Sequence, residues 1–296
     1  MKRVLLLVWA AVCVGCEPEY EDPAVPAGAL ELRDVGFAAP ESVLHDSVAD
    51  VYLVSNINGG GRDRDDNGFI SRVSPGGELL ELKWIDGADE NVRLSAPKGS
   101  AIIGDSLFVA DLDTIRIFDR HTGAPIGAIG IPNAVALNDL AVDVLGALWV
   151  SDMGDGTPET AARTGLHRIA PGGGSMLIGR GTDIEGPNGI AALDSAVAVA
   201  SYRGNTIRIA SGKGMGGTIA TLGGSRLDGV VALADGSLLV SSWDAMAIFR
   251  VASDGATSVL IDNLQSPADI AYDARRNRLL VPSFEGNWLR IYPLEP

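Results

Sequence analysis

Residues 136–152 read ALNDLAVDVLGALWVSD, and related segments recur along the whole chain. Each segment starts with a short apolar strand, turns tightly through polar residues and ends with an alternating strand that finishes in small or acidic residues. The other five are PESVLHDSVADVYLVSN from Pro40, APKGSAIIGDSLFVAD from Ala96, GPNGIAALDSAVAVAS from Gly186, RLDGVVALADGSLLVSS from Arg226 and SPADIAYDARRNRLLVPS from Ser266. A third strand follows, as at 113–118 and 205–209.

The spacing of the repeats predicts the architecture. One polar marker residue per repeat gives intervals of 57, 40, 50, 40 and 41 residues. The markers are Glu41, Lys98, Asn138, Asn188, Asp228 and Asp269. The two long intervals carry insertions at 59–68 and 155–165. A period of about 40–50 residues with several strands per unit is typical of propeller blades. We therefore predict an all-β protein, a six-bladed β-propeller.

The ends of the chain predict how the ring closes. The last repeat has sequence for only three strands, whereas residues 29–37 (ALELRDVGF) are strand-like and precede the first blade. We expect this N-terminal strand to close the last blade as its outer strand, which leaves no open sheet edge. Two tandem sandwiches would not explain one motif that repeats across the chain.

The N-terminus predicts export and lipidation. Lys2 and Arg3 precede an apolar run at 4–14, which is too short to span a bilayer as a helix. The run ends in CVGC, which resembles a bacterial lipobox whose Cys16 is lipidated, although Cys13 stands where Leu is usual. We assign 1–15 to a lipoprotein signal peptide, 16–28 to the lipidated cysteine and a flexible tether, and 29–296 to the propeller. The alternative is ordinary signal cleavage with a stray cysteine.

Cysteine content and charge narrow the partners. The chain has two cysteines, both at or before the proposed cleavage point, so the mature protein can form no internal disulfide. The formal charge is −15, and loss of Lys2 and Arg3 takes it to −17. Such a surface argues against nucleic acid as a partner. We expect a monomer held to the membrane by its N-terminal anchor, facing the periplasm or the cell exterior.

The marker residues also predict a site. The first strand of every propeller blade lines the central channel, so residues at its start converge on the axis. Five of the six markers carry oxygen donors, which suit a hard divalent cation, Ca²⁺ first and Mg²⁺ or Mn²⁺ next. The alternative is that these side chains hydrogen-bond backbone groups at turn entries.

The ordered set of motifs resembles the senescence-marker/gluconolactonase/luciferin-regenerating-enzyme family of six-bladed propellers. Glu in the first blade, Asn-Asp in the third, Pro-Asn-Gly in the fourth and Asp-Gly in the fifth are that family's metal-ligand positions. The resemblance implies that Glu41, Asn138, Asn188 and Asp228 hold the metal. The family's Gly-Pro-x-Trp after the first Glu is absent, and its substrate-gripping Arg is replaced by Ala136.

The resemblance implies metal-dependent hydrolysis of a lactone or related ester in the central channel. The catalytic residues would be Asp228 or Asp269 as general base, with Lys98 attracting an anionic substrate or balancing the carboxylates. A non-catalytic propeller like the NHL-repeat proteins, binding a protein or glycan partner in the cell envelope, is the alternative. A structural component of an envelope assembly is a third possibility.

Overall fold

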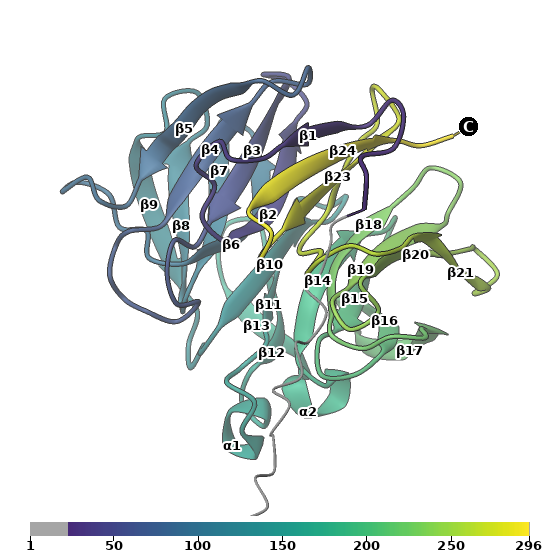
Figure 1. Ribbon diagram of the computed structural model, residues 1–296. Helices are drawn as coiled ribbons and strands as arrows, with labels where there is room; N and C mark the ends of the chain where they lie inside the picture. The colour runs from purple at the N-terminus through teal and green to yellow at the C-terminus, as the bar shows by residue number, and fades with distance from the viewer. Residues whose placement is uncertain (1–22, 296) are drawn as a thin grey trace, which may run out of the picture.

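The six repeats form six four-stranded antiparallel sheets in a computed structural model that describes residues 23–295 (Figure 1). Blade 1 contains β2 (Pro40–Asp46), β3 (Val51–Asn56), β4 (Phe69–Val73) and β5 (Leu79–Asp86). Blade 2 contains β6 (Pro97–Ile103), β7 (Ser106–Asp111), β8 (Thr114–Asp119) and β9 (Pro125–Gly130). Blade 3 contains β10 (Leu137–Val142), β11 (Leu148–Asp152), β12 (Gly165–Ile169) and β13 (Ser175–Arg180).

The remaining blades follow in the same order. Blade 4 contains β14 (Pro187–Ala192), β15 (Val197–Ser201), β16 (Thr206–Ser211) and β17 (Gly214–Thr221). Blade 5 contains β18 (Leu227–Ala232), β19 (Leu238–Ser242), β20 (Ala247–Val251) and β21 (Thr257–Ile261). Blade 6 contains β22 (Ala271–Asp273), β23 (Arg278–Ser283), β24 (Trp288–Pro293) and β1 (Leu30–Leu32). The predicted six-bladed propeller is confirmed.

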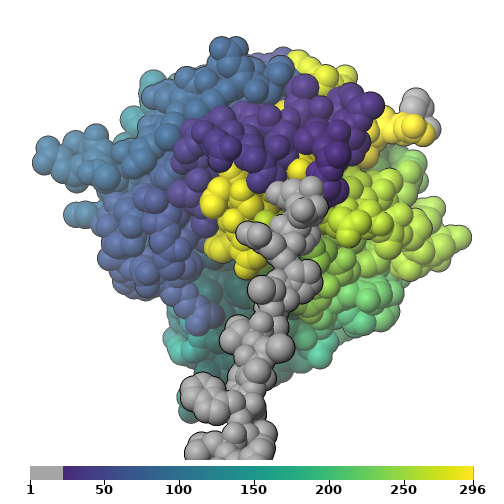
Figure 2. Space-filling model, in the orientation of Figure 1, coloured from purple at the N-terminus to yellow at the C-terminus, as the bar shows by residue number. Residues whose placement is uncertain are grey.

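Ring closure occurs as predicted, since β1 pairs with β24 through Leu30↔Ile291 and Leu32↔Leu289. The first described segment therefore lies over the end of the chain (Figure 2). The strand is shorter than the strand-like sequence at 29–37, because Asp34 and Gly36 have φ angles of 57° and 99°, which end an extended conformation. Before it, the backbone carbonyl of Pro23 accepts a hydrogen bond from Arg290 at 3.1 Å.

The hydrophobic core is divided among the interfaces between neighbouring blades. Each of the six large apolar clusters joins two adjacent sheets, as where Leu53 and Ile70 of blade 1 pack against Val109 and Phe118 of blade 2. A twisted sheet in such a ring has both faces covered, so its inner strands are apolar on both sides. Burial of a Val, Leu or Phe side chain contributes about 1.5–3 kcal/mol.

Two short helices interrupt the strands. The insertion predicted at 155–165 contains α1 (Pro158–Ala161), whose first turn is capped by Thr157, and α2 (Gly181–Ile184) follows β13. No helix among residues 23–295 has the length and apolar character needed to cross a bilayer. The predicted signal peptide at 1–15 and Cys16 lie outside the described residues, and so does most of the predicted tether.

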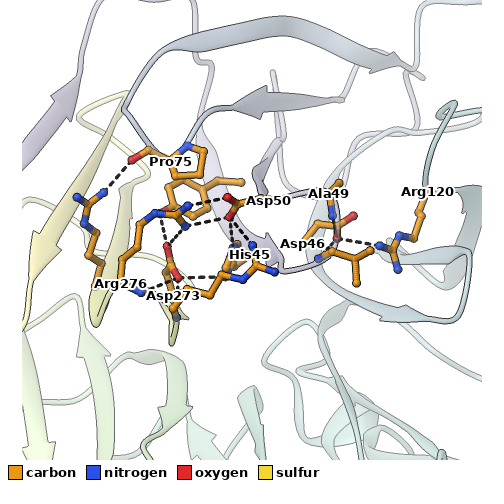
Figure 3. A network of polar contacts seen from close by, with 12 residues as sticks. His45, Asp46, Ala49, Asp50, Pro75, Arg120, Asp273 and Arg276 are labelled. Atoms are coloured by element: carbon orange, nitrogen blue, oxygen red, sulfur yellow. Dashed lines mark hydrogen bonds and ion pairs between the residues drawn. The ribbon is translucent and has the colours of Figure 1, made fainter.

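A polar network ties the last blade to the first (Figure 3). Arg276, in the β22–β23 turn, donates to Asp273 at 2.9 Å and to Asp50 of the β2–β3 turn at 2.6 Å. The Tyr52 hydroxyl donates to Asp273 at 2.7 Å, and His45 contacts Asp50 at 3.3 Å. His45 is therefore a packed structural histidine, stacked edge-on against Tyr52.

The same turn of blade 1 also reaches blade 2. Arg120 donates to Asp46 at 3.0 Å, and both side chains are buried. The Asp46 carboxylate also accepts from the backbone N–H groups of Val48 and Ala49, which defines the β2–β3 turn. The network thus lies at the ends of the inner strands and joins three blades around the closure point (Figure 3).

We predict that Arg276→Met lowers the free energy of unfolding by about 1.5–3 kcal/mol, the usual contribution of hydrogen bonds to charged groups. Asp273 is fully buried and would lose its guanidinium partner. Arg64→Met is the matched control, because Arg64 and Asp113 pair with side chains that are 63% and 37% exposed. Such surface pairs contribute about 0–1 kcal/mol. Urea denaturation measures the free energy of unfolding of both variants. Equal losses in the two variants would contradict a stabilising role for the network around Arg276.

Candidate metal centre

The candidate site lies where the inner strands begin. This is the end of the channel opposite the polar network around Arg276. A pocket of about 410 Å³ opens there. Its floor contains five of the six marker residues, which are Glu41, Lys98, Asn138, Asn188 and Asp228. Their side chains are buried, with 1–6% of each residue exposed. Residues from five blades thus meet at the axis.

A bulge at the start of each inner strand sets the direction of these side chains. The strand register shifts between Pro97 and Ser100, between Leu137 and Leu140, and at the matching places in blades 4 and 5. A bulge bends the strand and re-aims one side chain. In blades 3 and 5 a serine of the second strand binds the backbone N–H that the bulge frees, as where Asp139 donates to Ser151 at 2.9 Å.

The acidic end of the second strand holds the entry to the inner strand. Asp152 accepts from the N–H groups of Val135 and Ala136 at 3.0 and 2.9 Å. In blade 2, Asp111 accepts in the same way from Ser95 and Ala96. The aspartates that close the second and third repeats therefore fix the backbone before the site residues.

Glycine follows the site residue in blades 2, 4 and 5 because adjacent inner strands touch there. A Cβ on Gly189 would lie 2.1 Å from the carbonyl oxygen of Asp228, and one on Gly229 would lie 2.3 Å from the nitrogen of Ile270. A Cβ on Gly99 would lie 2.2 Å from an Asp139 oxygen. The Asn-Gly and Asp-Gly pairs of the repeat are thus required by close packing at the axis.

Four buried oxygen atoms on the pocket floor have no hydrogen-bond partner among the described residues. They come from four different blades and are Glu41 Oε2, Asn138 Oδ1, Asn188 Oδ1 and Asp228 Oδ1. The second polar atom of three of these side chains is engaged. Asn138 Nδ2 donates to Glu41 Oε1 at 3.3 Å, and Trp243 Nε1 donates to Asp228 Oδ2 at 2.7 Å.

This donor set fits a hard cation. An unpaired buried polar atom costs about 1–3 kcal/mol, so four in one place need a common partner. Two carboxylates and two amide carbonyls are the ligands that Ca²⁺ accepts, and Mg²⁺ or Mn²⁺ also bind oxygen. Residues 23–295 contain no cluster of three or more His, Cys, Asp or Glu side chains suited to a metal, so an ion on this floor would have to bind the asparagine oxygens as well as the two carboxylates.

The charges of the floor are unfavourable without a cation. Burial and the neighbouring Asp228 raise the pKa of Glu41 well above its usual range. Burial and Asp269 raise the pKa of Asp228 to about 8. Burial lowers the pKa of Lys98, and the negative charge of Glu41 partly offsets this shift. A divalent ion would stabilise the ionised carboxylates.

Lys98 has a structural task that the sequence did not indicate. Its ammonium donates to the carbonyl of Gly61 at 3.0 Å and to that of Ala96 at 3.4 Å. Gly61 belongs to the insertion at 59–68, which supplies Arg62 and Asp63 to the pocket lining. Lys98 thus joins the pocket floor to the loop at its mouth, beside the carboxylates.

Asp269 lies one residue further along its strand than the other markers. The register of blade 6 pairs Pro267 with Ser283 and Ala271 with Leu280, which puts Ala268 at the position of Asp228. The alignment of the sixth repeat therefore has to be corrected by one residue, to an interval of 40 instead of 41. The sequence could not show this register, because Pro267 and Ala268 have no polar side chain that aligns with the markers of the other repeats.

Asp269 and Asp139 form a second, deeper layer of carboxylates. Asp269 accepts from the Ser42 hydroxyl at 2.6 Å, and Asp139 accepts from Ile190 N at 2.6 Å. Both line a separate cavity of about 290 Å³ nearer the other end of the channel. Burial raises the pKa of Asp269 to about 7. The sequence analysis did not single out Asp139 as a site residue. With the corrected alignment, Asp139 and Asp269 occupy the position at which three other repeats have glycine.

An apolar ring surrounds the mouth of the pocket and was not predicted. The first residue after the second strand is apolar or aromatic in every blade, and five of these six residues line the pocket. Those five are Ile57, Met153, Tyr202, Trp243 and Phe284. Each donates its backbone N–H to the segment that enters the inner strand, as Trp243 does to Arg226 at 3.1 Å. Aligning the repeats one residue further would have revealed this ring.

A larger cavity of about 1020 Å³ lies on the outside, between blades 5 and 6. Its two arginines are both paired with carboxylates, Arg250 with Asp235 and Arg290 with Glu31. None of the predicted site residues lines it. The axial pocket is the site in which unpaired polar atoms converge.

The sequence matches no family model and no curated protein sequence. Solved structures are similar over 90% of the chain: a putative gluconolactonase at 18% identity, covering 93% of that chain with a TM-score of 0.66. A gluconolactonase from Xanthomonas campestris is 17% identical, and the match covers 100% of that chain with a TM-score of 0.62. Virginiamycin B lyase from Staphylococcus aureus is 15% identical, covered over 99%, with a TM-score of 0.61. These likenesses show a shared six-bladed propeller fold.

We predict that Ca²⁺ stabilises the protein, and more at pH 8 than at pH 5. Without a cation, folded Asp228 and Asp269 keep their protons to about pH 8 and 7, whereas unfolded aspartate loses them near pH 4. The folded state then holds more protons, so stability falls as pH rises through this window. A cation bound at 100 times its Kd adds about 2.7 kcal/mol.

Thermal unfolding with and without Ca²⁺ at both pH values measures the effect. Asp228→Asn should remove most of the gain at pH 8, whereas Asp194→Asn, an exposed turn residue, should keep it. An unchanged Tm on adding Ca²⁺, Mg²⁺ or Mn²⁺ at pH 8 would exclude the metal centre.

Proposed function

We propose that this protein is a metal-dependent hydrolase of a lactone or related ester, with its active site in the axial pocket. The observation that carries the proposal is the set of four buried, unpartnered oxygens from four blades. A pocket of about 410 Å³ above them is the size of a small-molecule site.

Glu41, Asn138, Asn188 and Asp228 would hold the cation. When bound, it would polarise the substrate carbonyl and stabilise the negative charge that develops on its oxygen. Trp243 orients Asp228, and Glu41 and Asn138 orient each other through a hydrogen bond, so three of the four proposed ligands would be held in place before an ion binds. Preorganised ligands need no rearrangement during the reaction.

Asp228 is the favoured general base. Its Oδ1 faces the pocket without a protein partner, and a carboxylate oxygen has lone pairs for both an ion and a water proton. Asp228 would take a proton from the attacking water as the water oxygen bonds to the acyl carbon, and that proton would pass to the leaving oxygen as the acyl C–O bond breaks. Asp269 is less well placed, since it is bonded to Ser42 and lines the deeper cavity.

Lys98 would balance the charge of the floor. It is the buried cation of the ring, and its attraction to Glu41 and Asp228 opposes their mutual repulsion. Its hold on Gly61 also keeps the mouth loop over the floor. Attraction of an anionic substrate then falls mainly to Arg62, which lies in the exposed part of that loop.

The structural neighbours include two kinds of enzyme, and the pocket favours one of them. A gluconolactonase and a lyase share the fold, and a catalytically inactive form of the lyase has one histidine replaced by alanine. All three histidines of this chain are among the described residues, and none lines the axial pocket. Hydrolysis with a carboxylate base is therefore the better match for this chain, and it supports the proposed kinship with the gluconolactonase-like family.

We predict that Asp228→Ala lowers kcat/KM for lactone hydrolysis by about 10²–10⁴, the usual contribution of a general base. A pH-stat assay on a panel of simple lactones in Ca²⁺ measures it, and circular dichroism checks that the fold is kept. Removing the cation with a chelator should abolish activity, and restoring Ca²⁺ should recover it. Full activity in the chelator would refute the proposal.

The alternative, a non-catalytic binding propeller, has a distinct outcome in the same experiment. Such a protein would hydrolyse no lactone, and Asp228→Ala would leave partner binding unchanged. Substitutions on exposed loops would then matter more than those on the pocket floor.

We further propose that the protein is an exported, lipid-anchored lipoprotein. The support is the apolar run ending in CVGC, with both cysteines of the chain at that place. The anchor would hold the propeller at the membrane surface through the segment at 16–28.

We predict that Cys16→Ser moves the protein from the membrane fraction to the soluble exported fraction, while Cys13→Ser leaves it membrane-bound. Fractionation after labelling with a radioactive fatty acid measures both variants. Lipid incorporation into Cys16→Ser would overturn the assignment.

A further inference from the structure

We propose that the axial pocket selects lactones or esters that carry an aromatic or other flat apolar substituent. The inference rests on the proposed hydrolase function and names the substrate class of that site. The wall formed by Tyr202, Trp243 and Phe284, called here the aromatic wall, would pack against the substituent while the ester group lies over the oxygen floor.

The aromatic wall is continuous across three blades. Tyr202, Trp243 and Phe284 follow the second strands of blades 4, 5 and 6, and all three line the pocket. The ring centroids of Trp243 and Phe284 lie 5.2 Å apart, and those of Tyr202 and Trp243 lie 6.5 Å apart. These three side chains are only partly buried, so they offer apolar surface to the pocket.

The polar atoms of the aromatic wall are already engaged. Trp243 Nε1 donates to Asp228, and the Tyr202 hydroxyl accepts two hydrogen bonds from Arg226 at 3.1 and 3.3 Å. The Arg226 guanidinium also stacks on Trp243, 4.7 Å from the ring centroid. Arg226 is not a lining residue, so it holds the wall from outside. What remains for a ligand is mainly ring surface.

Opposite the aromatic wall, polar lining residues other than the floor come from the mouth loop, which supplies Arg62 and Asp63, and the rest of that side is apolar. Ile57, Met153 and Ala136 supply apolar surface there. The hydroxyl groups of a sugar lactone would be desolvated against these side chains with few partners, which is unfavourable. An aromatic substituent would instead gain offset-stacked or edge-to-face contacts.

Kinetics on three γ-lactones with one common ring test the proposal. They are γ-phenyl-γ-butyrolactone, unsubstituted γ-butyrolactone and the dihydroxylated erythronolactone. In Ca²⁺, kcat/KM should be at least tenfold higher for the phenyl lactone than for erythronolactone. Equal or faster hydrolysis of erythronolactone would overturn the inference while leaving the hydrolase proposal intact.

Phe284→Ala tests the aromatic wall without touching the oxygen floor. The ratio of kcat/KM for the phenyl lactone to that for γ-butyrolactone should fall at least tenfold, chiefly through KM. Phe108→Ala is the matched control, because Phe108 is partly buried in the blade 2 and 3 interface, outside the pocket. An unchanged ratio in Phe284→Ala would contradict the role of the wall.

A binding measurement separates failure of the inference from failure of the proposed function. The lactam 5-phenyl-2-pyrrolidinone has the shape of the phenyl lactone and resists hydrolysis. Calorimetry with the Ca²⁺-loaded protein should detect its binding, weakened at least tenfold by Phe284→Ala. Binding without hydrolysis of any lactone would refute the hydrolase alone, and absence of binding would refute the aromatic-substituent pocket.

Discussion

Every blade of this propeller can bury its two faces only between two neighbours, and the rest of the structure depends on that constraint. Each apolar cluster lies between two blades. An open ring would therefore expose to water the two blade faces that meet at the break. The chain meets the constraint at one place, where β1 completes the sheet of β22, β23 and β24. The network around Arg276 fastens the same junction at the far end of the inner strands.

Ring closure brings six inner strands close to one axis, and this crowding shapes the site. In blades 2, 4 and 5 glycine is needed where neighbouring strands touch, and the residue before each glycine lines the axial pocket. Bulges at these positions turn the side chains inward, and acidic or hydroxyl groups of the second strand bind the backbone that the bulges release. The oxygen floor is thus a consequence of how the blades pack, with its chemistry set by the single residue at each bulge.

The pocket combines a charged floor with an apolar mouth, and Trp243 belongs to both. Its indole N–H orients Asp228, while its ring forms the centre of the aromatic wall. The apolar mouth lowers the local dielectric around the carboxylates, which would strengthen their attraction to a cation. Below the floor lies the deeper pair, Asp139 and Asp269, and burial together with Asp269 raises the pKa values of both Asp139 and Asp228.

The sequence by itself determined the number of blades, the closing strand and the residues that meet at the axis, because one period ran through the chain and polar residues kept their place in it. It did not determine the register of the sixth repeat, where Ala268 carries no marker and Asp269 lies one residue further on. Only the tertiary structure decided that Lys98 binds the mouth loop and that Asp139 joins Asp269. It alone also placed residues that follow the second strands in a ring around the mouth. These features arise from contacts between blades, which a repeat pattern within one blade does not contain.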